Sequence, residues 1–301
     1  MTDRFVAAGD LQLRTESFGN PSGTPLLLIM GASAPGCYWR DEFVDGFVKR
    51  GCYVIRYDNR DTGRSTCLDF AKQPYTLDDL ATDAVAVLDA YGLKSAHVAG
   101  ASMGGMIVQM LMLRHRSRLR SATIIMSSPL AGGELRADDL PAPDASWMQQ
   151  FMAVALSPAT SREAHIDRKV KMYQLMAGSA QVFDEARQRA VASIEVAQAI
   201  NLDAAMNHTF AIGASSPKDR RELLKTVDVP TLVIHGTEDP ILPYAHGVAL
   251  AQTIRGAQLL TLARAGHEIP HCYVTEITDR MLALQESAQE QPLINVPQST
   301  Y

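Results

Sequence analysis

Short, continuous apolar runs alternate along the first half of the chain with longer stretches in which apolar residues recur at helical spacing. Residues 26–30 and 53–57 are runs of the first kind, which are typical of parallel strands covered on both faces. Residues 39–50 and 76–91 have helical spacing, and each stretch is followed by a glycine that favours a helix end. The pattern therefore predicts strands and helices in alternation.

The same pattern continues toward the C-terminus, apart from one interruption. Strands alternating with helices imply a mostly parallel, twisted sheet flanked by helices on both faces. Further strands are predicted at residues 4–6, 11–15, 97–100, 119–126, 230–234 and 258–262, and further helices at 103–114, 244–254 and 274–289.

The interruption is a helical, polar segment without strand-like runs at residues 131–225. The simplest interpretation is an α/β core formed by residues 1–130 and 226–291, with residues 131–225 inserted as a helical cap. Residues 292–301 contain two prolines and several small polar residues, and we expect a loosely ordered tail there.

Charge and composition exclude several classes of partner. Lys and Arg total 28 against 33 Asp and Glu, a formal net charge of −5, without a basic cluster that would favour nucleic acid or an anionic membrane. No apolar run is long enough to span a membrane, and the N-terminus lacks the features of a signal peptide. Four scattered cysteines without a CxxC pair indicate reduced, buried thiols in a cytoplasmic protein. A homodimer is compatible with the sequence, which does not determine the oligomeric state.

One motif combines the predicted topology with reactive chemistry. Gly100 and Gly104 flank Ser102 in a G-x-S-x-G pattern between a predicted strand and a predicted helix. A sharp strand-to-helix turn needs small residues on both sides of its tip, and it exposes the serine above the sheet. The helix start also leaves the Met103 N–H unpaired and directed at the same point. Ser102 is therefore the candidate nucleophile.

A serine hydroxyl is a weak nucleophile, so it needs a base, and the base needs an acid to orient it. Asp239 follows the predicted strand at residues 230–234, and His267 follows the one at residues 258–262. The loops after these strands should meet Ser102 at the carboxyl edge of the sheet. Asp239 is the favoured acid, with Glu238 as the alternative, and His267 is the candidate base.

An oxyanion hole would complete this site. We expect its backbone donors to be the N–H groups of Met103 and of Ala32, which lies in the loop after the first long strand. Gly31 is small enough to let that loop approach the substrate. Trp147 and Phe151 follow helical spacing in the insertion, where they either line a substrate pocket or pack the cap on itself.

With these residues in place, the chain resembles the α/β-hydrolase fold family over nearly its whole length. The resemblance implies that Ser102, Asp239 and His267 form a catalytic triad and that the insertion caps the site. Within the family, residues 56–66 resemble the aclacinomycin methylesterase group, which hydrolyses a methyl ester on a polyketide-derived antibiotic. The matching segments are residues 28–31, 57–65, 100–105, 235–240 and 266–267.

The chain departs from the family pattern at two places. Met30 stands before Gly31 where many members have histidine, which alters the floor of the oxyanion loop. Asp61 stands after Arg60 where many members have glycine. We interpret Asp58, Arg60 and Asp61 mainly as a structural charge and turn cluster, with substrate contact as the alternative.

The remaining histidines suggest less. Residues 267–271 match the H-E-x-x-H zinc motif, but that motif requires a continuous helix, and Pro270 disfavours one. A metal site is therefore not expected. We expect His115, His165 and His208 at the surface or in the cap.

The sequence thus predicts a serine hydrolase that cleaves a small-molecule carboxylic ester through an acyl-enzyme, without cofactor or metal. The same triad could also hydrolyse a carbon–carbon bond, a lactone or an amide. A ligand receptor that keeps the fold without turnover is the alternative from another functional class.

Overall fold

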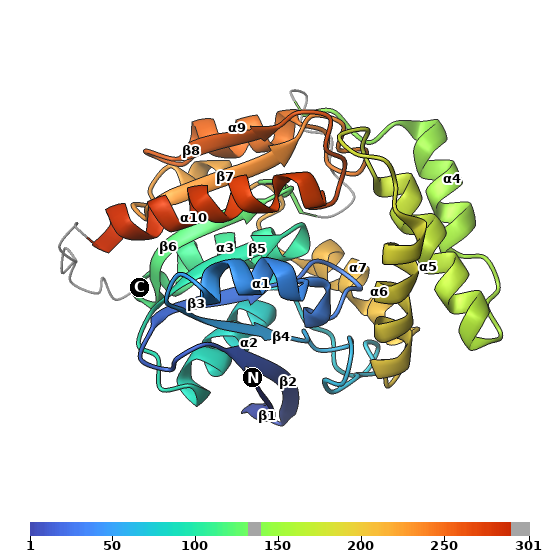
Figure 1. Ribbon diagram of the computed structural model, residues 1–301, viewed down its shortest axis with the longest axis horizontal. Helices are drawn as coiled ribbons and strands as arrows, with labels where there is room; N and C mark the ends of the chain where they lie inside the picture. The colour runs from blue at the N-terminus through green and yellow to red at the C-terminus, as the bar shows by residue number, and fades with distance from the viewer. Residues whose placement is uncertain (132–139, 290–301) are drawn as a thin grey trace.

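A twisted sheet runs through the middle of the molecule (Figure 1), in a computed structural model that describes residues 1–131 and 140–289. Within these residues the sheet has eight strands in the order β1-β2-β4-β3-β5-β6-β7-β8. The strands are β1 (Thr2–Ala8), β2 (Leu11–Phe18), β3 (Thr24–Ile29), β4 (Cys52–Tyr57), β5 (Ala96–Ala101), β6 (Leu119–Ile125), β7 (Thr231–Gly236) and β8 (Gln258–Leu262).

The sheet is mostly parallel, as the uninterrupted apolar runs predict. β1 and β2 form an antiparallel hairpin, and β2 also pairs antiparallel with β4, whereas all pairs from β4 to β8 are parallel. Every residue of β4 and β7 is buried, because helices cover both faces of these strands.

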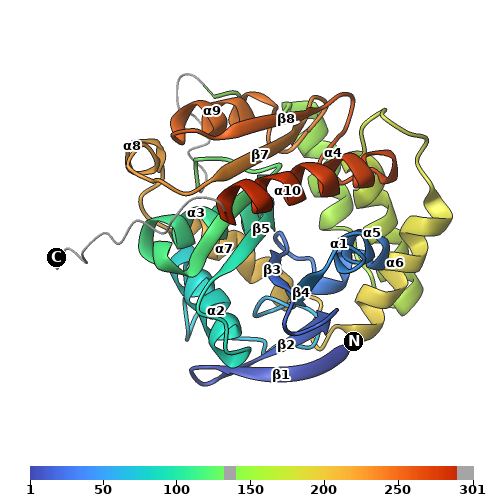
Figure 2. The same ribbon diagram turned by 60° about the vertical axis from the view of Figure 1, so that its left-hand side comes forward.

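Helices cover the two faces of the sheet and create two hydrophobic cores (Figure 2). Apolar residues of α1 and α10 pack on one face, and those of α2, α3 and α9 pack on the other. The bounds are α1 (Asp41–Val48), α2 (Leu77–Ala90), α3 (Met103–Arg114), α9 (Ala245–Thr253) and α10 (Val274–Gln289).

The segment between β6 and β7 is helical where the structure describes it. Its helices α4, α5 and α6 stand together at one end of the sheet, on the right of Figure 1. The bounds are α4 (Ala145–Ala155), α5 (Arg162–Met176), α6 (Glu185–Gln198), η3 (Ala204–Met206), α7 (Asn207–Ala214) and α8 (Arg221–Leu224).

Some details differ from the sequence predictions. The helix expected at residues 39–50 is α1, which begins at Asp41 because Trp39 and Arg40 are not helical, and the short helix η1 (Gly36–Tyr38) precedes it. All four cysteines are free, but only Cys52 is buried, whereas Cys37 and Cys67 are partly exposed and Cys272 is exposed. Cys272 lies in the short helix η4 (His271–Tyr273). The tail expected at residues 292–301 lies outside the described residues.

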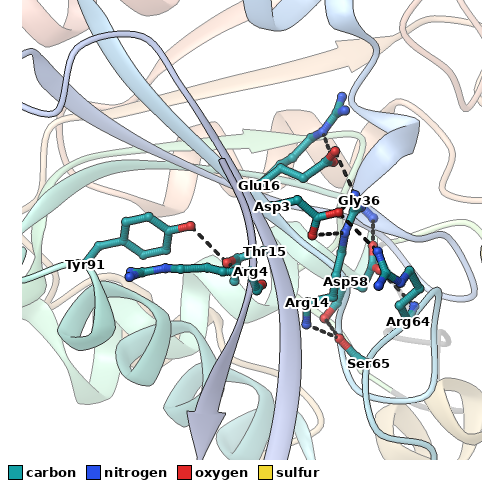
Figure 3. A network of polar contacts seen from close by, with 11 residues as sticks. Asp3, Arg4, Arg14, Thr15, Glu16, Gly36, Asp58, Arg64, Ser65 and Tyr91 are labelled. Atoms are coloured by element: carbon teal, nitrogen blue, oxygen red, sulfur yellow. Dashed lines mark hydrogen bonds and ion pairs between the residues drawn. The ribbon is translucent and has the colours of Figure 1, made fainter. Parts of the chain in front are cut away.

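A network of polar contacts joins the N-terminal hairpin to the loop that follows β4 (Figure 3). On β2, Arg14 pairs with Asp3 at 3.1 Å and with Glu16 at 2.8 Å. The Ser65 hydroxyl accepts the N–H of Arg14 and donates to the carbonyl of Asp58. Because most of these side chains are buried, their bonds hold the loop firmly against the sheet.

Candidate active site

Ser102 occupies the turn between β5 and α3, and its backbone has the strained conformation expected of a nucleophile at such a turn. Its φ is +55° and its ψ is −120°, values that a non-glycine residue rarely adopts. The Ser102 N–H donates to the carbonyl of Ile125 on the neighbouring strand at 2.8 Å. The side chain stays partly exposed at the end of the sheet.

The two glycines around this turn are required because a side chain at either position would collide with the backbone. A Cβ on Gly100 would lie 2.1 Å from the carbonyl oxygen of Gly104, and one on Gly104 would lie 2.2 Å from that of Ile29. Any side chain at either position would therefore push α3 away from β5 or β3. This is the steric reason that the sequence motif predicted.

Asp239 and His267 meet at the same edge of the sheet. Ser102, Asp239 and His267 follow β5, β7 and β8, and the carboxyl ends of these parallel strands lie side by side. His267 Nδ1 lies 2.8 Å from Asp239 Oδ2. Burial alone would raise the pKa of Asp239, but its charge and hydrogen-bond interactions with His267 and His235 outweigh burial and hold that pKa well below its usual range.

Sequence reasoning missed His235, a second histidine on the same carboxylate. His235 Nε2 lies 2.7 Å from the carbonyl oxygen of Leu242 and 3.2 Å from Asp239 Oδ2. The other oxygen, Asp239 Oδ1, accepts the N–H groups of Ile241 and Leu242. Both oxygens of the carboxylate are therefore held. The available signal was a histidine at the end of a buried strand, four residues before the aspartate.

The loop after β3 passes directly over the serine. A Cβ on Gly31 would lie 3.0 Å from the Cβ of Ser102 and 3.6 Å from its Oγ, so a side chain at this position would crowd the serine. None of the hydrogen bonds found among the described residues uses the backbone N–H of Ala32 or Met103 as donor. Within that part of the chain, neither N–H group has an acceptor in the protein.

Residues after β4 support this loop from below. The Asn59 side chain donates to the carbonyl of Met30 at 3.0 Å, and the buried Asp58 carboxylate accepts the N–H of Gly36 at 2.8 Å. Arg60 forms two 2.7 Å bonds with Asp83. These contacts agree with the structural interpretation of the charged cluster.

Asp61 is also engaged within the protein. Its carboxylate accepts the Tyr75 hydroxyl at 2.6 Å, the N–H of Leu68 at 2.6 Å and the side-chain amide of Asn207 at 3.1 Å. The aspartate that replaces the family glycine therefore joins the loop after β4 to the inserted segment.

The inserted segment rests on the loops that carry Asp239 and His267. The His267 N–H donates to the carbonyl of Met176 at 2.8 Å. A Cβ on Gly266 would lie 2.1 Å from the same carbonyl oxygen. Glu238, the alternative acid, is exposed and accepts both the N–H and the hydroxyl of Ser179. Glu238 therefore binds the insertion to the loop after β7.

The other expected residues have varied positions. Trp147 and Phe151 stack on each other with ring centroids 5.0 Å apart, and the Trp147 indole donates to the carbonyl of Leu175. A cavity of about 280 Å³ lies between the insertion and the loops after β3 and β4, but neither aromatic lines it. Their stacking and the Leu175 bond favour packing within the insertion.

The zinc-motif histidines do not share a helix, because Pro270 is extended and His271 begins the short helix η4. No group of three or more ligand-type side chains in the described ranges could hold a metal ion. Within those ranges, no helix is long and apolar enough to cross a membrane. His208 was expected at the surface or in the cap, and it lies on α7 but is fully buried. The second of these two places is the one observed, and both ring nitrogens have hydrogen-bond partners in the loops after β3 and β4.

Comparisons with known proteins agree with this geometry. The rhodomycin D methylesterases DauP, of Streptomyces sp. (strain C5), and DnrP, of Streptomyces peucetius, are each 34% identical to this chain over 281 residues, covering 90% of this chain and 93% of theirs. The solved esterase EaEST from Exiguobacterium antarcticum has a TM-score of 0.75 at 18% identity, covering 96% of this chain and 100% of its own. The enol-lactonase from Burkholderia xenovorans LB400 has a TM-score of 0.72 at 21% identity, covering 94% and 100%.

Sequence and fold lead to the same classification. A family model described as the alpha/beta hydrolase fold matches residues 24–271, which span the sheet from β3 to the histidine loop. The chain therefore belongs to the alpha/beta hydrolase fold family.

Proposed function

We propose that this protein is a serine hydrolase of carboxylic esters, and that Ser102, Asp239 and His267 are its catalytic triad. The observation that carries the proposal is the 2.8 Å contact between His267 and the buried Asp239, at the sheet edge where Ser102 stands in a strained turn. Triads are recognised by such geometry and not by position in the chain.

In the proposed mechanism, the Ser102 hydroxyl attacks the ester carbonyl carbon and His267 Nε2 takes its proton. Asp239 keeps the other imidazole proton on Nδ1 and stabilises the imidazolium that forms. His267 then protonates the leaving alcohol, and the ester bond breaks to leave an acyl-enzyme. Water, deprotonated by the same histidine, attacks the acyl group and releases the acid and Ser102.

The negative charge on the carbonyl oxygen needs donors that are already in place. The free N–H groups of Ala32 and Met103 on the two sides of Ser102 support their assignment as the oxyanion hole. Loss of one such donor costs about 3–4 kcal/mol of transition-state stabilisation in comparable sites.

We further propose that residues 131–225 act as a cap that selects the substrate. The contacts of Met176 and Ser179 with the catalytic loops support this role. The identity to two rhodomycin D methylesterases supports a methyl ester on a multi-ring aromatic molecule as the substrate class.

The test compares wild type with Ser102→Ala on two substrates, a short p-nitrophenyl ester and the methyl ester of an anthracycline-type aromatic acid. We expect Ser102→Ala to lose at least about 10³-fold in kcat/KM while its thermal melting stays close to wild type. Ser287→Ala, which removes a hydroxyl on α10, is the matched control and should keep full activity. Equal rates in wild type and Ser102→Ala would overturn the serine mechanism.

A wider panel separates the alternatives. Faster turnover of a lactone, an amide or a carbon–carbon substrate, lost in Ser102→Ala, would keep the mechanism but change the substrate class. Tight binding without turnover would instead favour the receptor interpretation.

A further inference from the structure

The loop that carries Ala32 is bonded to two residues of the insertion through Ser33. Ser33 has a φ of +61°, and its N–H donates to His208 Nδ1 at 3.0 Å. The Ser33 hydroxyl donates to the carbonyl of Ala205 at 2.8 Å. His208 lies on α7 and Ala205 lies in η3, so both partners belong to the insertion and not to the sheet.

The second nitrogen of His208 determines how the ring is protonated. Nε2 lies 2.7 Å from the carbonyl oxygen of Arg60, which can only accept a proton. The N–H of Ser33 can only donate, so Nδ1 must present its lone pair. Both bonds coexist in only one state, the neutral ring with its proton on Nε2. Complete burial lowers the pKa of His208 and favours this neutral state, even though Asp61 faces the ring.

The consequence for the oxyanion loop follows from backbone geometry. Gly31 has no side chain to restrict the preceding peptide, so the chain before Ala32 can rotate. Anchoring the Ser33 N–H fixes the peptide plane on the other side of Ala32. Only the two backbone torsions of Ala32 then separate this fixed plane from the peptide that carries the Ala32 N–H, so the anchor narrows the directions that this N–H can take.

We propose that His208 is a positioning residue for the oxyanion hole, and that it makes the seating of the insertion on the core a condition for oxyanion stabilisation. This inference rests on the proposed function, because it concerns the donor at Ala32. His208 does not touch the substrate. Its effect passes through the Ser33 N–H, so it should change kcat more than KM.

Two matched variants separate the two bonds of the ring. In His208→Asn, the side-chain oxygen can occupy the place of Nδ1 and accept the Ser33 N–H, while the bond to Arg60 is lost. In His208→Gln, the longer amide can reach the carbonyl of Arg60 from the place of Nε2, while the Ser33 N–H loses its acceptor.

The readouts are kcat and KM on the p-nitrophenyl ester and the rate of inactivation by a p-nitrophenyl phosphonate, whose P=O group uses the same hole. We expect His208→Gln to lose about 10- to 100-fold in kcat and in inactivation rate, with KM within about threefold of wild type. His208→Asn should keep both rates within about fivefold. Equal losses in both variants, or full kcat in His208→Gln, would overturn the proposal.

A control variant and a measurement on the wild type distinguish a specific effect of His208 from general misfolding. His97→Asn alters another buried histidine, whose Nδ1 bonds the Ser121 hydroxyl at 2.8 Å, and it should lower the melting temperature without changing kcat. If neither His208 variant folds, the wild type still decides the matter by ¹⁵N NMR. We expect His208 Nδ1 to be unprotonated at pH 7 and the Ser33 amide to be protected from hydrogen exchange. A protonated Nδ1 or a rapidly exchanging Ser33 amide would contradict the inference.

Failure of the inference can be distinguished from failure of the proposed function. Equal rates in wild type and Ser102→Ala would remove the proposed function before His208 is considered. Activity that depends on Ser102 but is indifferent to the acceptor at Ser33 would remove the inference alone.

Discussion

The carboxylate of Asp239 is fully occupied by donors. Two backbone N–H groups hold one oxygen, and His267 and His235 hold the other. A buried carboxylate keeps its charge and its orientation when hydrogen-bond donors contact both of its oxygens. This fixed partner orients the ring of His267, so the geometry of the candidate triad depends also on His235 and on two backbone N–H groups outside it.

We therefore expect Asp239→Asn to lower kcat by about 10³- to 10⁴-fold, because the amide no longer selects the Nδ1-protonated tautomer or stabilises the imidazolium. Steady-state kinetics on the p-nitrophenyl ester would measure the loss. Glu238→Gln is the matched control, since Glu238 is exposed and bonded to Ser179. A larger loss in Glu238→Gln than in Asp239→Asn would reverse the assignment of the acid.

At the scale of elements, the close packing of α3 against β3 and β5 places the serine. Gly104 lets the first turn of α3 contact the carbonyl of Ile29, and Gly100 lets β5 pass under the same turn. The helix therefore begins at Met103, directly after Ser102, which is its N-cap, and the Met103 N–H has no partner within the helix.

Gly104→Ala should destabilise the protein by about 2–4 kcal/mol and strongly reduce activity, because its Cβ would overlap a backbone carbonyl that has no room to move. Gly213→Ala on α7 is the matched control. A Cβ there meets nothing within 4 Å, so the change should be neutral or stabilise by up to about 1 kcal/mol. Urea unfolding of both variants measures the difference, and equal stabilities would disprove the steric argument.

At the scale of the whole molecule, buried neutral histidines link stability to pH. Burial lowers the pKa of His97 from 6.5 to about 4, and it also lowers the pKa values of His208 and His246. These groups gain protons more readily in the unfolded chain than in the folded one. Their contribution to the free energy of unfolding is therefore fully present above pH 6.5. It is lost as the pH falls toward the lower pKa that each histidine has in the folded protein.

For His97 the lowered pKa corresponds to about 3 kcal/mol of unfolding free energy between pH 6.5 and pH 4. We expect His97→Asn to be less stable than wild type at pH 7.5 and to approach or exceed wild-type stability near pH 4.5. Urea unfolding at intermediate pH values would follow the gap. A gap that does not change with pH would show that His97 titrates alike in both states.

Local patterns were sufficient for the sheet and its helices. Uninterrupted apolar runs, helical spacing and the glycines beside Ser102 depend on neighbours in the chain, so they predicted the α/β order and the serine turn. The loops after β7 and β8 could be assigned to the same site because parallel strands share a carboxyl edge. The helix expected at residues 39–50 was confirmed as α1, but it begins two residues later because no local signal marks the extended backbone of Arg40.

The sequence by itself determined the fold and the candidate triad, because these follow from short-range pattern and from the order of strands. Only the tertiary structure decided which residues support the site. His235 meets Asp239 across a strand end, and His208 meets Ser33 across 175 positions of the chain. The His208 contact arises when the insertion folds back onto the core, whereas the His235 contact depends on the turn that follows β7. A single sequence carries no periodicity that records either contact, because one depends on an irregular turn and the other on the placement of two segments far apart in the chain.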